Sequence, residues 1–171
     1  MILGLDISTS ITGVTLLSLD GEIILCDHID LRKHRNFFIK SEKVLEYFDA
    51  MDQQPVQIFI EQSLQSFRTG FSSAATLATL SRFNGVVSWL AYRRFAIEPE
   101  YIAATSARKK AGIKVVRGTP AKQQVLAHIL DTVPSFVIEY TPKGNPRPGT
   151  YDRADSLVVA KAGLVCMNEK S

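Results

Sequence analysis

The sequence predicts a single α/β domain in which a five-stranded mixed sheet is flanked by helices. Three observations lead to this prediction: three β-rich runs open the chain, a nearly all-apolar run follows a first helical stripe, and helices then alternate with a short strand. The 171 residues match one domain of roughly 150 residues, so we expect one domain over residues 1–171. With 46% hydrophobic and 22% charged residues, the composition excludes wholesale disorder.

The first three strands are expected to form an antiparallel meander. They are predicted at residues 2–7, 13–19 and 22–30. Asp20-Gly21 joins the second and third strands, and Asp-Gly between apolar runs is the strongest short hairpin signal. The run Val56–Glu61 (VQIFIE) predicts a buried parallel strand, and residues 101–104 predict a short one. The sheet is therefore expected to contain three antiparallel strands and then parallel strands.

Five helices are expected between and after these strands. They are predicted at residues 36–51, 73–95, 105–112, 120–131 and 151–167. Thr105 or Ser106 is expected to cap the third helix, and Thr119-Pro120 fits an N-cap followed by the first helical residue of the fourth. Residues 134–150 hold four of the seven prolines and two glycines, which predicts an irregular loop.

The sequence contains no sign of a membrane segment or a secretion signal. No apolar run approaches the ~20 residues needed to cross a bilayer, and the first residues lack the basic segment of a signal peptide. Cys26 and Cys166 lie in apolar contexts at unrelated spacing, so we expect buried thiols and no zinc site. The three histidines have no ligand spacing and are expected to be surface or hydrogen-bonded residues: His28, His34 and His128. These features predict a cytoplasmic protein.

The net charge of +3 is unevenly distributed. Between Arg82 and Lys122, nine basic residues stand against two acidic ones, so this sector carries +7 and the rest of the chain carries −4. A basic sector on an otherwise acidic protein suits a polyanion such as nucleic acid. A solvated lysine-rich face would have the same composition, so charge alone leaves both interpretations open.

Four acidic residues stand at the ends of elements that are otherwise apolar: Asp6, Glu61, Asp152 and Asp155. Asp152 and Asp155 open the last helix three residues apart, which places both on one face. Removing a carboxylate from water costs free energy unless it is paired with a positive charge. The repulsion between several converging carboxylates is best relieved by a divalent metal such as Mg²⁺ or Mn²⁺. Taken singly, each acid has a plainer explanation as an N-cap, a salt-bridge partner or a solvated strand end. Their common placement favours a metal site.

The motifs around these acids resemble those of the RuvC-like Holliday junction resolvases of the RNase H-like superfamily. In that family the first catalytic Asp lies in a GxD…TG context, matched here by Gly4-Leu5-Asp6 and Thr12-Gly13. A Glu ends the fourth strand, matched by IFIEQ at 58–62, and the C-terminal helix opens with D-x-x-D-[AS]-L, matched by DRADSL at 152–157. Residues 101–111 and 118–122 resemble the family's basic helix and the entry to its next helix. Ile7-Ser8 replaces the family's usual Pro-Gly, and the segment after Glu61 is longer than in the bacterial enzymes, which indicates a divergent member, for example a viral or organellar one.

The resemblance implies an RNase H-like nuclease that resolves four-way DNA junctions by paired symmetric nicks. The four acids would hold two Mg²⁺ ions, with Mn²⁺ as a substitute, and hydrolysis would leave 5′-phosphate and 3′-hydroxyl ends. In the loop after Glu61, Phe67 and Arg68 would wedge against unpaired bases. The basic residues expected to bind DNA phosphates are Arg108, Lys109, Lys110, Lys114 and Lys122.

A four-way junction has two-fold symmetry, so the resemblance also implies a homodimer. The helix predicted at 73–95 would supply its interface through Leu80, Val87 and Trp89, although ordinary core packing explains the same stripe.

Other functions fit some of the same residues. A nuclease acting on RNA–DNA hybrids, flaps or other branched nucleic acids would use the same four acids. A non-catalytic DNA-binding relative would keep the fold, but such a relative would be expected to lose one or more of the acids. The segment LDISTSITG is also similar to the phosphate loop of actin-like and sugar-kinase ATPases, whose fold needs two such subdomains where one is expected here.

Overall fold

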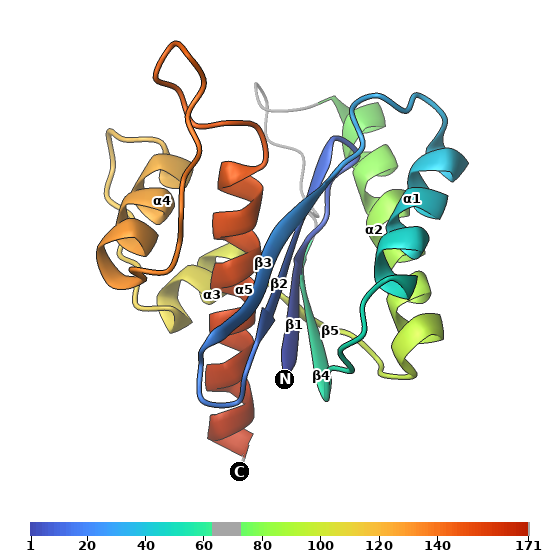
Figure 1. Cartoon of the computed structure of the whole chain (residues 1–171), viewed down its shortest axis with the longest axis horizontal. Helices are drawn as coiled ribbons and strands as arrows, with labels where there is room; N and C mark the ends of the chain where they lie inside the picture. Colours follow the sequence, from blue (N-terminus) through green and yellow to red (C-terminus); the bar gives the residue numbers. More distant parts are fainter. Residues whose placement is uncertain (63–72, 171) are drawn as a thin grey trace.

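A five-stranded mixed sheet lies at the centre of the computed structural model, which describes residues 1–62 and 73–170 (Figure 1). The strand order is β3-β2-β1-β4-β5. The strands are β1 (Ile2–Asp6), β2 (Ile11–Leu17), β3 (Ile23–Asp30), β4 (Gln57–Glu61) and β5 (Glu100–Ile102). The pairs β1–β2 and β2–β3 are antiparallel, whereas β1–β4 and β4–β5 are parallel. The predicted sheet of three antiparallel strands followed by parallel ones is confirmed.

Helices cover both faces of this sheet (Figure 1). They are α1 (Phe37–Asp49), α2 (Ala74–Phe95), α3 (Ala104–Lys110), α4 (Ala121–Thr132) and α5 (Thr150–Lys170). Strand side chains alternate between faces, so Leu3 and Leu5 pack in the core beneath α1 and α2, while Ile2 and Phe59 pack against α5 and its neighbours. Two hydrophobic cores therefore hold the sheet between two helical layers.

Two glycines let α5 lie directly on the sheet. A β-carbon at Gly4 would lie 2.6 Å from Cβ of Ala160, and one at Gly13 would lie 1.9 Å from the carbonyl oxygen of Asp152. Only glycine, which has no β-carbon, allows the helix to approach the strands this closely, because any other residue would push the helix away. The motif glycines of the first two strands thus bring the first turn of α5 over the end of β1.

Several predicted boundaries were wrong by one to three residues, and three of these differences have a clear local cause. Strand β2 begins at Ile11 and not at residue 13, because the Thr12 hydroxyl donates to the carbonyl of Ser8 at 3.1 Å and closes a short turn. Helix α3 begins at Ala104 without a side-chain cap, because it follows β5 almost directly. Pro120 has an extended ψ of 132° and is itself the N-cap of α4, so it does not form the first helical residue.

The predicted irregular loop before the last helix is confirmed. Residues 133–149 contain neither helix nor strand, apart from one isolated bridge between Tyr140 and Pro146. Both cysteines are free, and they are half-buried where full burial was predicted. No helix in the described ranges is long and apolar enough to cross a membrane.

Candidate active site

The register of the sheet brings Asp6 and Glu61 side by side. Leu5 pairs with Ile60 across the parallel strands, and the next residue of each strand is the acid that ends it. Asp6 also pairs with Gly13 on its other side. Paired residues face the same side of a sheet, and Gly13 faces α5. Both carboxylates therefore lie at the carboxyl ends of their strands on the face that α5 covers.

The first two turns of α5 add the other two acids. The helix begins at Thr150, so Asp152 lies inside the first turn and is not its N-cap. Asp155 is buried, with only 6% of its surface exposed. The negative charges of Glu61, Asp155 and Asp152 all raise the pKa of Asp6. The structure therefore brings the four predicted acids into one electrostatic environment.

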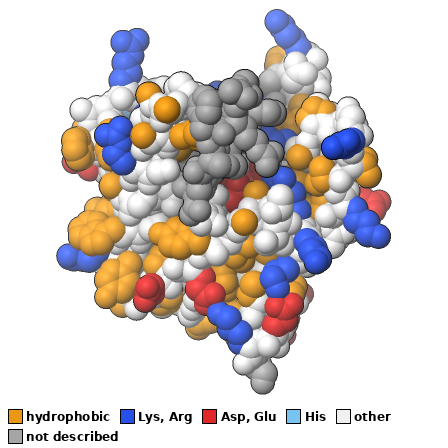
Figure 2. Space-filling view, turned by 180° about the vertical axis from the view of Figure 1, so that it is seen from behind, with side chains coloured by type: hydrophobic (Ala, Val, Ile, Leu, Met, Phe, Trp, Pro, Cys, Tyr) orange, Lys and Arg blue, Asp and Glu red, His pale blue; other side chains and the backbone are white. Residues whose placement is uncertain are grey.

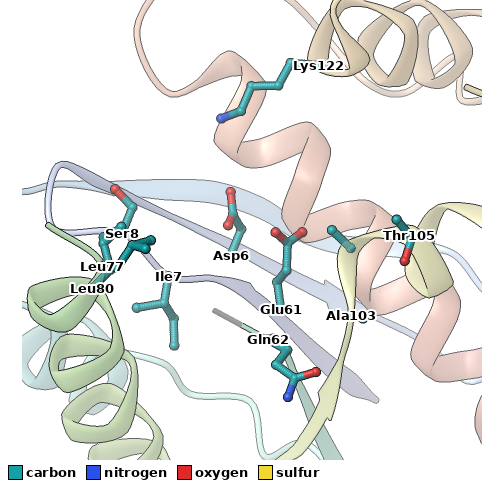
Figure 3. Close-up of a pocket in the computed structure, with 11 residues that line it drawn as sticks. Asp6, Ile7, Ser8, Glu61, Gln62, Leu77, Leu80, Ala103, Thr105 and Lys122 are labelled. Carbon is teal, nitrogen blue, oxygen red and sulfur yellow. The ribbon is translucent and has the colours of Figure 1, made fainter. Parts of the chain in front are cut away.

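A pocket with a volume of about 470 Å³ opens above the two strand ends, and Asp6, Glu61 and Lys122 are among the residues that line it. In Figure 3 the carboxylates of Asp6 and Glu61 point into the pocket, toward the ammonium of Lys122, which reaches down from α4. The Lys122 Nζ lies 3.7 Å from Oδ2 of Asp155. Leu77 and Leu80 of α2 form an apolar wall opposite Lys122. The pocket thus joins an acidic floor, one cation and an apolar side.

Burial raises the pKa of every acid in this group. The pKa of Asp6 lies well above its ordinary value, first because of burial and then because of the neighbouring carboxylates. Burial and the charge of Asp155 raise the pKa of Glu61 to about 7. Burial also raises the pKa values of Asp152 and Asp155, and Lys122 opposes both shifts. The positive charges of the protein therefore compensate only part of the negative charge of these four carboxylates.

The cations beside the acids supply part of the missing positive charge. Burial works against the charged form of Lys122, but the four carboxylates outweigh it and raise its pKa, so the ammonium stays protonated. Arg108 of α3 lowers the pKa of Glu61 and of Asp155. Two of the five predicted basic residues, Arg108 and Lys122, thus lie close enough to the acids to affect them.

The donor chemistry of the site fits a hard divalent cation. Four carboxylates with eight oxygen atoms are the ligand type that Mg²⁺ and Mn²⁺ prefer. Because the neighbouring carboxylates raise the pKa values of Asp6 and Glu61, positive charge added beside them would favour their ionised forms. As the side chains stand, no three acidic, cysteine or histidine residues within 1–62 and 73–170 converge tightly enough to enclose an ion. The fit therefore rests on donor type, burial and charge.

The other predicted DNA-binding residues are placed differently. Lys110 forms an ion pair with Glu169, with 2.5 Å between Nζ and Oε2, near the C-terminal end of α5. At 1.5 Å per helical residue, that end is about 20 Å from Asp155, so Lys110 is not part of the carboxylate site. Lys109 and Lys114 are exposed and form no ion pair with the residues that the structure describes. Phe67 and Arg68 lie outside the described residues.

The predicted interface stripe on α2 divides into three different environments. Val87 is fully buried in the core, and Leu80 lines the pocket. Trp89 is 55% exposed. Of the three residues, Trp89 presents the largest exposed surface to a partner, and the core-packing explanation is correct for Val87.

Two residues near the site were not found from the sequence. Asn84 is buried in α2, and its amide donates to the backbone carbonyl of Glu61 at 3.2 Å, which fixes the end of β4. His28 pairs with Gly13 in the same row of the sheet as Asp6. Its Nδ1 is buried without a hydrogen bond among the described residues but lies 3.6 Å from Oδ1 of Asp27, and the side chain is 29% exposed. The expectation of a surface or hydrogen-bonded histidine is therefore met only in part. Only the strand register, once known, places it beside the acids.

The strand order, the paired acids of β1 and β4, and the two acids near the start of α5 define a domain with the RNase H-like fold. No protein-family model and no curated protein matches the sequence. Among solved structures, the chain is similar to RuvC of Thermus thermophilus. The complex of this RuvC with a Holliday junction substrate matches with a TM-score of 0.67 and 13% identity, over 98% of this chain and 94% of that one. A second Thermus thermophilus RuvC structure matches with a TM-score of 0.66 and 15% identity, over 99% and 96%. The chain thus has the fold of RuvC, as its motifs predict.

Proposed function

We propose that this protein is a metal-dependent endonuclease that resolves four-way DNA junctions by paired, symmetric nicks. The observation that carries the proposal is the set of four acids from β1, β4 and α5, which the fold gathers beside a pocket that also holds Lys122. Structural proteins have little use for four adjacent buried or half-buried acids with raised pKa values, whereas hydrolytic metal sites use such sets. The shared fold with RuvC supports a junction as the substrate.

Asp6, Glu61, Asp152 and Asp155 are the residues that would hold Mg²⁺, or Mn²⁺ in its place, and two ions fit a set of four carboxylates. Bound divalent ions lower the pKa of water and stabilise a leaving oxygen in phosphodiester hydrolysis, which yields 5′-phosphate and 3′-hydroxyl products. Lys122 is placed to pair with a phosphate oxygen that enters the pocket, because its side chain is 59% exposed while its Nζ reaches Asp155. Arg108 adds positive charge next to Glu61.

The surface around the pocket supports a nucleic-acid substrate. On the face shown in Figure 2, most Lys and Arg side chains lie over the side of α3 and α4, next to the pocket. The exposed lysines of this side include Lys109 and Lys114. A row of cations beside a metal site is the arrangement that holds a phosphate backbone in register for cleavage.

A homodimer matches the two-fold symmetry of a four-way junction. Hydrophobic side chains gather on the α2 side of Figure 2, away from the basic side. Trp89 and Tyr92 of α2 are 55% and 49% exposed, and Tyr101 of the edge strand β5 is 50% exposed. Large exposed aromatic residues of this kind are typical of protein interfaces. We therefore place the dimer contact on this side.

The test is a cleavage assay with a labelled immobile four-way junction, a matched duplex and an RNA–DNA hybrid, each with Mg²⁺ and with EDTA. Asp6→Asn removes one acid of the site, and Asp131→Asn, at an exposed position of α4, is the matched control. We expect paired nicks in the junction that require Mg²⁺, persist in Asp131→Asn and disappear in Asp6→Asn. Cleavage of the hybrid alone would replace the proposal with an RNase H-type activity. Binding without any cleavage would reduce the protein to a DNA-binding module.

A further inference from the structure

The connection between β3 and α1 lies at the same end of the sheet as the carboxylates. Strands β1 and β3 both run antiparallel to β2, so both end at this edge. Gly13 pairs with Asp6 on one side and with His28 on the other, and β3 continues two residues further to Asp30. Residues 31–36, which follow Asp30 and lead into α1, therefore start from the edge where the acids gather (Figure 1).

Ion pairing holds the beginning of this connection in place. Arg32 donates to both carboxylate oxygens of Asp30, at 2.9 Å from Nε and 2.6 Å from an amino nitrogen. The positive charge of Arg32 also lowers the pKa of Asp152 in α5. The connection is thus close enough to the carboxylate site to act on it electrostatically, and Arg32 itself is already neutralised by Asp30.

The next two basic residues have no such partner. Lys33 and Arg35 are exposed and make no ion pair with any residue in the described part of the chain. The connection ends at Asn36, whose side chain caps α1 by accepting from the backbone N–H groups of Phe38 and Ile39 at 2.8 and 3.2 Å. Two uncompensated cations are therefore presented from a loop that is fixed at both ends.

An exposed aromatic side chain follows three residues after Arg35 in the chain, in the first turn of α1. Phe38 is 72% exposed, the highest value among the large hydrophobic side chains that the structure describes. Its ring contacts Phe37 edge to face at 5.6 Å, and Phe37 contacts Phe83 in the same manner at 5.4 Å. Phe83 is fully buried. The exposed ring is therefore held by a chain of aromatic contacts that leads into the core, and little freedom is lost when a ligand stacks on it.

A further contact joins this surface to the pocket. The ammonium of Lys40, in the first turn of α1, donates to the backbone carbonyl of Thr9 in the turn that follows β1. The same turn contributes Ser8 to the lining of the pocket. The first turn of α1 and the carboxylate site are consequently linked through one short segment, with Asp6 at its other end.

We propose that Lys33, Arg35 and Phe38, here called the α1 surface, bind unpaired nucleotides of the strand that the carboxylate site cleaves. The two cations contact successive phosphates, and one base stacks on the Phe38 ring. Cations interleaved with a presented aromatic ring are the arrangement by which proteins hold single strands, whereas a paired duplex offers phosphates to the cations but no base face to the ring. The inference rests on the proposed nuclease function and adds to it a binding site for unpaired nucleotides.

Binding measurements in the Asp6→Asn background test the α1 surface without cleavage. The probes are a fluorescent oligothymidylate, a duplex of equal length, and a four-way junction with unpaired nucleotides at its centre. Phe38→Leu keeps an apolar side chain but removes the ring, and Phe38→Tyr keeps the ring. Ile39→Ala removes a neighbouring exposed apolar residue as the matched control, and Lys43→Ala removes a cation of the same helix that is already paired with Glu46.

We expect Phe38→Leu to weaken binding of the oligothymidylate about tenfold and that of the duplex less than twofold, whereas Phe38→Tyr and both controls bind as the parent does. The double variant Lys33→Ala/Arg35→Ala should lower the slope of log affinity against log salt for the single strand by about 0.7 for each phosphate that the variant leaves unneutralised. Thermal unfolding of each variant verifies that these exposed substitutions leave the fold intact.

Equal binding of the single strand by the parent, Phe38→Leu and the double variant would overturn the inference. An equal weakening for single strand and duplex in the double variant, with no effect of Phe38→Leu, would also overturn it, because the surface would then bind only a duplex backbone. Cleavage of the junction by the unmutated chain is measured in parallel. Failure to cleave, with single-strand binding still dependent on Phe38, would refute the proposed nuclease function and leave the α1 surface standing as a single-strand binding site.

Discussion

Replacing Glu61 with Gln should stabilise the metal-free protein above neutral pH. The pKa of Glu61 is about 7, compared with an ordinary value of 4.5, and each pKa unit corresponds to about 1.4 kcal/mol. Once ionised, this carboxylate therefore costs the folded state about 3 kcal/mol of unfolding free energy. Glutamine has nearly the same shape without the charge, so Glu61→Gln removes the cost and also lessens the repulsion on Asp6.

The sign of the pH dependence follows from proton binding. Between about pH 4.5 and 7 the folded state holds the Glu61 proton more tightly than the unfolded chain does. The unfolding free energy of the parent protein should accordingly fall as the pH rises through this range. The unfolding free energy of the Glu61→Gln variant should fall less. Near pH 4.5 the two proteins should be similarly stable, and at pH 8 the variant should be more stable by up to about 3 kcal/mol.

Urea unfolding in EDTA at pH 4.5 and pH 8 measures this difference directly. Glu42→Gln, at an exposed position of α1, is the control for the loss of one negative charge. Addition of Mg²⁺ at pH 8 should stabilise the parent more than the Glu61→Gln variant, because the variant lacks one ligand. A Glu61→Gln variant that is no more stable than the Glu42→Gln control at pH 8 would refute the reasoning about buried carboxylates.

Two further substitutions test how the site is built. Gly13→Ala should lower the unfolding free energy by about 2–3 kcal/mol or more and impair cleavage, because its β-carbon would lie 1.9 Å from the carbonyl oxygen of Asp152. Gly85→Ala, in the open middle of α2, should instead leave stability unchanged or raise it by up to about 1 kcal/mol, and comparable thermal unfolding of the two variants would contradict the close-approach argument. Asn84→Leu should lower the unfolding free energy by about 1–3 kcal/mol, because it removes the amide that donates a hydrogen bond to the backbone carbonyl of Glu61. It should also raise the Mg²⁺ concentration that gives half-maximal cleavage. An unchanged Mg²⁺ requirement would reduce Asn84 to a purely structural residue.

The four acids of the site could be predicted from the sequence because each one interrupts or ends a segment of apolar residues. Asp6 and Glu61 end apolar strands, and Asp152 and Asp155 follow a proline-rich loop into an apolar helix, so each acid is conspicuous in its own segment. The antiparallel meander also follows from local signals such as Asp20-Gly21, whereas the pairing of β1 with β4 joins segments that are distant in the chain.

The residues that escaped prediction depend on pairing between distant segments. His28 lies in an ordinary strand, and only the register that sets it opposite Gly13 places it in the row of Asp6. Asn84 is one polar residue in an Ala-rich helix, and its bond to the carbonyl of Glu61 is a contact between backbone and side chain with no sequence signature. Lys110 belongs to the same basic run as Arg108, but the two point toward opposite ends of α5. Charge counted along the chain cannot separate them.

The placement of α5 has a consequence for the synthesis of the protein. Strands β1 to β4, with both acids of the sheet, lie within the first 61 residues, whereas the other two acids arrive only with the 21-residue helix that begins at Thr150. The glycines at positions 4 and 13 leave space on the surface of the sheet into which this helix packs. A nascent chain that has not yet docked the helix carries half of the carboxylates and an open groove. In the proposed nuclease, hydrolysis would therefore begin only after α5 has been made and docked, which would keep shorter nascent chains from cutting nucleic acid.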